Sequence, residues 1–166
     1  MKTLLASIAL ASLAMSAQAA TWEDQSRRDK VDGPVAMFVS DADKHDMTLP
    51  YEGNSISLIM RGIKGKRELF VSFGRYLCNN PRAPSTFAWV VNNGKVNEAT
   101  TGVLSSADST TVFLQGKTLD AFAKDLAEAT VLDLRFSDFC GNVINAKWTF
   151  PAPGFSERWK AITAKP

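Results

Sequence analysis

Residues 55–73 read SISLIMRGIKGKRELFVSF, and this stretch decides the fold class. Apolar and polar side chains alternate in residues 55–61 and again in residues 68–73, which is the period of a strand with one buried face. The residues between them include Gly62 and Gly65, a composition that is typical of a tight hairpin loop. The stretch therefore predicts an antiparallel β-hairpin in which one face of each strand joins a hydrophobic core.

The same alternation recurs along most of the chain. Besides the hairpin, the expected strands are residues 35–40, 87–92, 95–99, 110–115, 131–136 and 143–150. Asn93 and Gly94, between two of these strands, are a strong hairpin signal because both residues tolerate a positive φ. Sequential strands joined by Gly and Asn turns predict a mainly β fold, either an antiparallel β-sandwich or a partly open barrel.

One packed α-helix interrupts the strands over residues 118–129. Thr118 can cap its N-terminus, and Asp120 lies in the first turn, where the helix dipole favours an acid. Its apolar residues recur at helical spacing, so one face is expected to pack on the core: Leu119, Phe122, Ala123 and Leu126. A short C-terminal helix is expected to begin near Ser156.

Residues 1–19 have the pattern of a secretory signal peptide. Lys2 supplies a positive charge, residues 4–15 form an apolar run, and residues 16–19 (SAQA) offer the small-x-small pattern that signal peptidase needs. A transmembrane anchor is the alternative reading, but the apolar run is too short for a hydrocarbon core of about 30 Å. We therefore expect cleavage after Ala19 and a mature protein in the periplasm or secreted.

The mature chain is expected to contain three segments. Residues 20–34 are a polar N-terminal lead, residues 35–155 form the β-sandwich domain, and residues 156–166 form the tail helix. Because an exported protein folds in an oxidising compartment, Cys78 and Cys140 are expected to form a disulfide bond. Two free thiols are the alternative.

Composition and charge exclude several classes of protein. The 166 residues are 45% hydrophobic, and 19 Lys and Arg stand against 17 Asp and Glu, a formal net charge of +2. A disordered chain would have fewer apolar residues and a larger net charge. A dedicated nucleic-acid binder would show clustered basic residues, whereas here they are scattered among acids along the chain. We expect no nucleic-acid partner and no membrane span after cleavage.

The densest group of potential metal ligands is the segment SDADKHD, which contains Asp41, Asp43, His45 and Asp46. Its spacing partly matches a calcium loop, but Asp46 stands where such a loop needs glycine, and no helix flanks the segment. We expect no metal there. The segment is read as a solvated loop between two strands and as a candidate partner contact.

A second cluster is basic and lies in the predicted hairpin. It consists of Arg61, Lys64, Lys66 and Arg67. Such clusters are usually solvated turn residues. The alternative is a contact with an anionic surface such as lipopolysaccharide or peptidoglycan.

No pattern of residues predicts a catalytic site. A serine hydrolase needs a base, but His45 is the single histidine of the chain and no G-x-S-x-G motif occurs. No glycine-rich phosphate loop stands in a strand–helix context. Paired carboxylates for glycoside hydrolysis are conceivable, but sequence spacing does not place them together. We expect no enzymatic activity and no cofactor.

The order of these features resembles one family. The segments that carry the resemblance are Leu58–Arg61 (LIMR), Glu68–Leu77 (ELFVSFGRYL), Phe87–Gly94 (FAWVVNNG), Leu132–Phe136 (LDLRF) and Trp148–Phe150 (WTF). Their order is similar to that in the exported accessory proteins of type VI secretion, the VasI/TagO-like family, over residues 35–155. In that family a Cys follows the Arg of the first hairpin strand, and this chain has Gly62 there. The resemblance implies an accessory role and no catalytic residues.

These observations predict a non-enzymatic, exported binding or accessory protein of a bacterial envelope machine, with an envelope protein as its partner. The alternative is a periplasmic inhibitor or ligand-binding module that acts on a hydrolase or an envelope component. An inhibitor would present a protruding loop, for which SDADKHD is the candidate. An accessory protein would show an exposed apolar patch or an open sheet edge, and an enzyme a concave pocket with perturbed acids.

Overall fold

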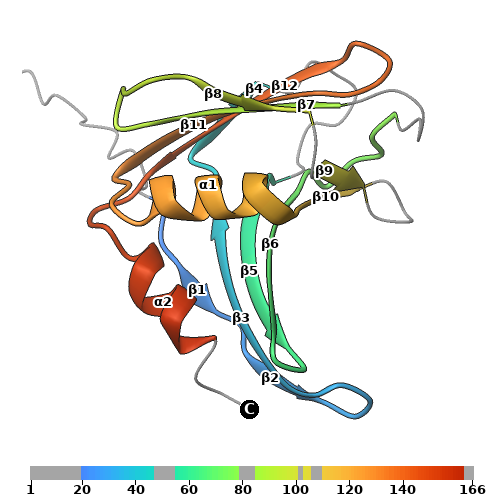
Figure 1. Ribbon diagram of the computed structural model, residues 1–166, viewed down its shortest axis with the longest axis vertical. Coiled ribbons are helices and arrows are strands. Elements are labelled where there is room, and N and C mark those ends of the chain that lie inside the picture. The colour runs from blue at the N-terminus through green and yellow to red at the C-terminus, as the bar shows by residue number, and fades with distance from the viewer. Residues whose placement is uncertain (1–19, 47–54, 79–84, 101–102, 106–109, 163–166) are drawn as a thin grey trace, which may run out of the picture.

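The computed structural model describes residues 20–46, 55–78, 85–100, 103–105 and 110–162. These residues form two antiparallel sheets and two helices, and the sheets cross at a steep angle (Figure 1). The prediction of a mainly β, sandwich-like fold with one packed helix and a short C-terminal helix is confirmed. Neither helix has the length and apolarity that crossing a membrane would require.

The seven-stranded sheet has the predicted hairpin at its centre. Its strand order is β1-β3-β5-β6-β10-β9, and β2 also pairs with β3. The strands are β1 (Glu23–Asp24), β2 (Arg27–Asp29), β3 (Gly33–Asp41), β5 (Ser57–Ile63), β6 (Lys66–Ser72), β9 (Val103–Ser105) and β10 (Thr111–Leu114). Between β5 and β6, Lys64 and Gly65 both take a positive φ, so the hairpin turn is shorter than the predicted loop.

The five-stranded sheet has the order β4-β12-β11-β7-β8. Its strands are β4 (Lys44–Asp46), β7 (Thr86–Val91), β8 (Asn97–Ala99), β11 (Val131–Ser137) and β12 (Val143–Thr149). The chain passes between the sheets at Ala42 and Asp43, because β3 pairs with β5 and β4 pairs with β12. The segment SDADKHD therefore consists of the end of β3, a two-residue link and β4, and the expectation of a solvated loop was wrong.

The polar lead is also part of the sheet. Residues 20–34, expected as a polar lead outside the β-sandwich domain, contain β1 and β2, and both strands pair with β3. These strands are mostly exposed, so they bury no face and show no hydrophobic alternation. Main-chain hydrogen bonds to β3 hold them, which residue pattern alone does not reveal.

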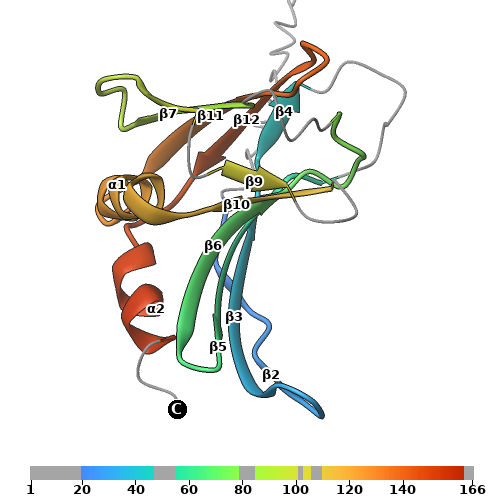
Figure 2. The ribbon, with the colours of Figure 1, turned by 45° about the vertical axis from the view of Figure 1, so that its right-hand side comes forward.

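Both helices lie on the same side of the seven-stranded sheet (Figure 2). The helix α1 (Gly116–Leu126) buries Thr118, Phe122 and Leu126, and the helix α2 (Phe155–Ala161) begins after Gly154. Gln115 stands at the N-cap of α1, so Thr118 is a buried residue inside the helix rather than its cap.

The core lies between the two sheets and beneath the helices. Phe73, which follows β6, contacts Phe136 of β11 with ring centroids 5.1 Å apart, and Phe122 of α1 packs edge-on against Phe87 and Trp89 of β7. Each such buried side chain contributes roughly 1.5–3 kcal/mol of hydrophobic stabilisation. The inward positions of the alternation in β7, β11 and β12 are buried, except Val91 at the end of β7, which is half-buried.

Candidate functional site

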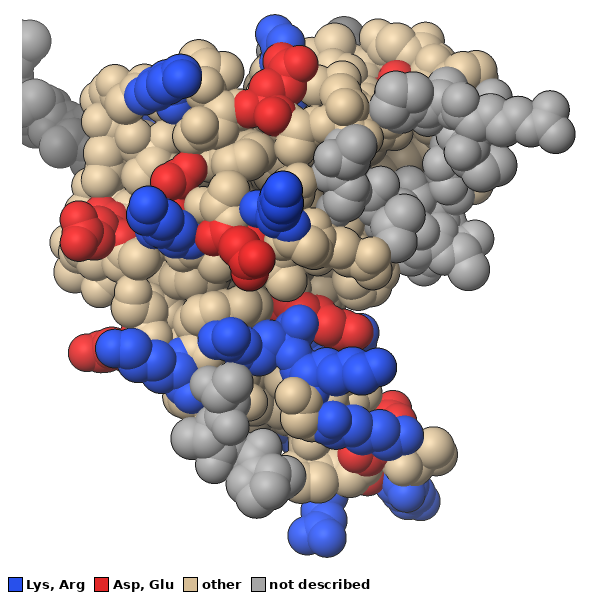
Figure 3. All heavy atoms as spheres, in the orientation of Figure 1, with Lys and Arg blue, Asp and Glu red and all other residues tan. Residues whose placement is uncertain are grey.

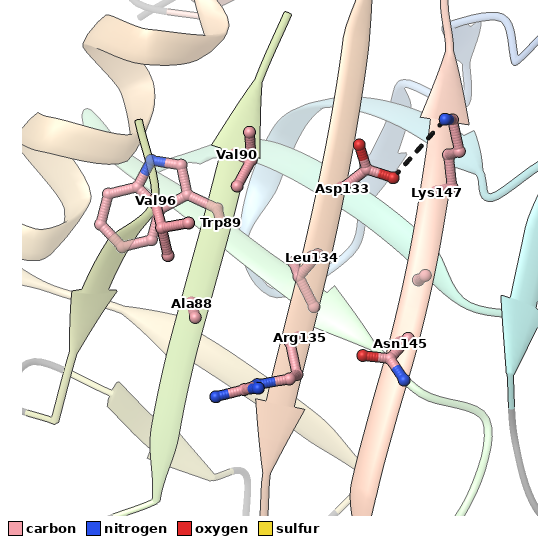
Figure 4. Close-up of a pocket in the computed structure, with 10 residues that line it drawn as sticks. Ala88, Trp89, Val90, Val96, Asp133, Leu134, Arg135, Asn145 and Lys147 are labelled. Carbon is pink, nitrogen blue, oxygen red and sulfur yellow. Dashed lines mark ion pairs between the residues drawn. The ribbon is translucent and has the colours of Figure 1, made fainter. Parts of the chain in front are cut away.

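The outer face of the five-stranded sheet is hollowed over β7, β11 and β12 (Figure 4). The pocket has a volume of about 480 Å³. It is built from side chains that alternate with core residues along the same strands. Trp89 of β7 packs against α1 in the core, so its neighbours Ala88 and Val90 face outward.

Strand register explains why the sheet is hollow at this point. Ala88 pairs with Arg135 on one side and with Glu98 of β8 on the other, and Arg135 pairs in turn with Asn145. A single methyl group therefore lies between long side chains, and Ala88 is only 5% exposed. Val96, in the loop before β8, is 61% exposed and also lines the pocket.

The pocket combines an apolar floor with a polar wall. Ala88, Val90 and Val96 supply the floor, while Arg135 and Asn145 supply polar groups from β11 and β12 (Figure 4). Apolar side chains such as those of the floor bind apolar groups of a ligand, and the polar side chains of the wall orient that ligand.

Two cationic side chains line this pocket, and one of them is paired with a carboxylate while the other is not. The Lys147 ammonium lies 3.7 Å from the Asp133 carboxylate, an ion pair in which both side chains are 44% exposed. Among the residues that the structure describes, none forms a hydrogen bond or ion pair with the exposed Arg135 side chain. Its five N–H donors are therefore available to an anionic group of a ligand.

The predicted cysteine pair is confirmed. Cys78 comes after β6 in the chain and forms a disulfide bond with Cys140, which lies in the turn between β11 and β12. The Cα–Cα distance is 5.7 Å. The buried Asp138 carboxylate accepts hydrogen bonds from the main-chain N–H groups of Cys78 at 3.1 Å and Asn142 at 2.9 Å. The bridge and this carboxylate together tie the two sheets at this turn.

The acidic residues of SDADKHD make internal contacts. Asp41 accepts a hydrogen bond from the Ser57 hydroxyl, and the Asp43 carboxylate accepts one from the Thr149 main chain. His45 and Asp46 lie in β4, and their side chains are outside the described part of the structure. No group of three His, Cys, Asp or Glu residues in the described part is arranged to hold a metal ion.

The basic hairpin residues lie at the opposite end of the molecule from the pocket. Arg61 pairs with Glu68 through Nε at 2.7 Å, Lys64 pairs with Asp32 at 2.8 Å, and the Arg67 guanidinium lies over the Trp159 ring. Lys66 is exposed. Three of the four predicted contacts for an anionic surface thus have intramolecular partners.

Basic residues from other segments of the chain lie near this hairpin in the folded protein. Figure 3 shows Lys and Arg side chains gathered over the end of the molecule that contains β2, the β5–β6 hairpin and α2. The additional residues come from β2, the turn after it and α2: Arg27, Arg28, Lys30, Arg158 and Lys160. The basic residues are therefore scattered along the chain but gathered in the fold.

The residues of the pocket were missed by sequence reasoning. Alternation within β11 and β12 indicates that Arg135, Asn145 and Lys147 face away from the core, but it does not show that Ala88 of β7 lies in the same row. Comparison with protein-family models, with curated proteins and with solved structures found no match. The chemistry of the pocket therefore carries the functional conclusion.

Proposed function

We propose that this chain is an exported binding protein of the bacterial envelope, an accessory to an envelope machine rather than an enzyme. It binds an envelope protein through the pocket on the outer face of the five-stranded sheet. The observation that carries this proposal is an apolar floor of Ala88, Val90 and Val96 next to the Arg135 guanidinium, which has no partner among the described residues.

The composition of the pocket favours a polypeptide ligand. Arg is enriched at protein–protein interfaces, and the residues that dominate binding energy sit in pockets that exclude water. The floor is wide enough for one apolar side chain, and Arg135 stands beside it for an acidic side chain or a terminal carboxylate. A partner segment that presents an apolar residue next to an acid fits both features.

The ionisable groups favour binding over acid–base chemistry. The carboxylate in the pocket, Asp133, is paired with Lys147 on the neighbouring strand. No histidine or cysteine is among the described residues that line the pocket. A general acid or base needs a group that exchanges a proton with substrate, and an exposed ion pair is a poor source of one.

Two features support export. The N-terminal segment has the pattern of a signal peptide, and the cysteines form a disulfide bond. Structural disulfides persist in oxidising compartments such as the periplasm.

Affinity capture from envelope extracts tests the proposal. The mature protein is used as bait beside Arg135→Glu, which reverses the free charge, and Ala88→Trp, which fills the pocket. Lys117→Glu, at an exposed position of α1, is the matched charge control. We expect the wild type and Lys117→Glu to capture the same envelope protein and both pocket variants to lose it.

Other outcomes would overturn the proposal. Equal capture by all four proteins would show that the pocket is not the binding site. Turnover of a cell-wall substrate by the purified protein would show that it is an enzyme. Inhibition of a captured hydrolase would instead support the inhibitor alternative.

A further inference from the structure

The first residue of the expected mature chain is already built into the core. Ala20 is 6% exposed, and its main-chain N–H donates to the Thr149 carbonyl at 2.9 Å. Two residues later the Trp22 ring stacks on Phe150, with centroids 5.7 Å apart and planes 2° apart. The hydrogen bond and the ring contact fix the Ala20 nitrogen beside the end of β12.

A carboxylate with an unused oxygen lies at the same place. One oxygen of Asp43 accepts the main-chain N–H of Thr149, the residue whose carbonyl binds Ala20. The other oxygen, Oδ1, is buried and accepts no hydrogen bond from any described residue. A buried carboxylate oxygen without a partner is unfavourable and rare in native proteins, so this atom needs an explanation.

The surroundings of both groups favour a cation. Ala20 and Asp43 line a pocket of about 280 Å³. All the charged side chains among its described lining residues are acidic, namely Glu23, Asp41 and Asp43. The described lining of this pocket therefore carries three carboxylates and no cation.

We propose that cleavage after Ala19 creates the α-ammonium group of Ala20 and that this group binds the Asp43 carboxylate, so that removal of the leader completes the fold. The inference rests on the export step of the proposed function. In the precursor the Asp43 carboxylate has no positive partner here, and the cleavage reaction itself creates one.

The chemistry of the step is a peptide-bond hydrolysis. The bond between the Ala19 carbonyl carbon and the Ala20 nitrogen breaks, and water supplies the second oxygen of the Ala19 carboxylate. Both protons of that water end on the Ala20 nitrogen, which becomes an ammonium group with three N–H donors. One donor retains the bond to Thr149, and the others become available to Asp43. Charge-assisted hydrogen bonds of this kind are stronger than hydrogen bonds between neutral groups.

The test compares chains that differ only at the first atom. A cleavable tag that leaves Ala20 as the first residue gives the free amine, and acetylation of that amine removes its charge. Both forms are made for the wild type, for Asp43→Asn and for the control Asp120→Asn, an exposed acid on α1. Thermal unfolding midpoints are then measured for all six proteins.

We expect acetylation to lower the midpoint by a few degrees in the wild type and in Asp120→Asn, and to have little effect in Asp43→Asn. An equal shift in all three backgrounds, or no shift in the wild type, would overturn the pairing. If Asp43→Asn does not fold, a chain with one added glycine before Ala20 decides the question. Its midpoint should fall to that of the acetylated chain, and a midpoint equal to that of the free amine contradicts the proposal.

Cleavage after Ala19 and the pairing of the Ala20 amine with Asp43 are tested by separate measurements. The mass of the protein exported from a bacterial host shows whether cleavage occurs after Ala19, and a different start would remove the premise. The tag-derived chain tests the pairing with Asp43 whatever that start is. Partner capture through the pocket at Ala88 is independent of both results.

Discussion

The two ends of the molecule carry positive charge in different ways. At the hairpin end, Arg61 and Lys64 are paired with acids, and Arg67 lies over Trp159. On the outer face of the five-stranded sheet, Arg135 stands beside an apolar floor and has no partner among the described residues. The hairpin end has more cations, and three of its four hairpin cations have intramolecular partners, whereas the pocket places an unpaired guanidinium beside apolar side chains.

This difference separates charge density from binding chemistry. A cation with an intramolecular partner must lose that contact before it binds a ligand, and an exposed cation on a convex tip gains little from a single contact in water. A cation beside an apolar depression can bind while the depression excludes water, which strengthens the interaction.

The largest effect is expected from the disulfide that ties the two sheets together. Replacing both Cys78 and Cys140 with Ser should lower the free energy of unfolding by about 2–5 kcal/mol, because the unfolded chain regains the freedom of the loop that the bridge closes. Urea unfolding with and without a reductant measures the loss. Reductant should lower the stability of the wild type to that of the double variant and leave the variant unchanged.

The next effect is on partner affinity. Arg135→Glu should weaken binding of the captured partner by about 2 kcal/mol or more, roughly 30-fold, because it reverses the unpaired charge beside the pocket. Lys66→Glu makes the same charge change at the hairpin end and should leave the affinity within about twofold. Titration of the purified partner measures both. A larger loss for Lys66→Glu would assign binding to the basic end.

The sequence predicts the centre of each sheet and the edge strand β8, which follows the Asn93-Gly94 turn, but it misses the edge strands β1, β2 and β4 for one physical reason. The strands β5, β6, β7, β11 and β12 bury one face, so their residues must alternate. The edge strands β1, β2 and β4 are two or three residues long. Such strands are too short to show a period, and main-chain pairing with a neighbour determines where they lie.

The cysteine pair and the pocket also differ in how far the sequence predicts them. The cysteine pair could be predicted, because residues 1–19 have the pattern of a signal peptide, which predicts an oxidising compartment, and the sequence contains two cysteines. The pocket depends on the register that places Ala88, Arg135 and Asn145 in one row across three strands. That register is set by packing of the opposite faces in the core, and no local pattern in any one strand contains it.

A smaller effect is expected where Arg67 covers α2. The Arg67 guanidinium lies 4.8 Å from the centre of the Trp159 ring, and cation–π contacts at exposed sites contribute about 0.5–1 kcal/mol. Arg67→Ala should therefore lower the free energy of unfolding by about that amount. Lys66→Ala is the neighbouring control, since no described residue pairs with Lys66. Equal stability of the two variants in urea unfolding would show that the ring contact is not stabilising.

The smallest effect is local to the turn that follows β2. Asp29 accepts the main-chain N–H groups of Val31 at 2.8 Å and Asp32 at 3.0 Å, and these bonds lower the pKa of the Asp29 carboxyl below its ordinary value of 3.8. On the alkaline side, the hydrogen bond to Asp32 raises the pKa of Lys64 above 10.5.

The signs of these shifts define the pH range over which the turn is held. A lowered carboxyl pKa means that the Asp29 bonds contribute fully above pH 3.8 and are lost as the pH falls through the folded-state pKa. The raised pKa of Lys64 means that its pairing contributes below pH 10.5 and is lost as the pH rises through its own folded-state pKa.

In an NMR titration, the Val31 and Asp32 amide shifts should change with a midpoint below 3.8, and Asp29→Asn should abolish the change. A midpoint at or above 3.8 would show that these amides do not stabilise the ionised carboxylate. The hairpin end thus uses these charges to hold its own turn, whereas the function proposed above places the ligand at Arg135, with which no described residue pairs.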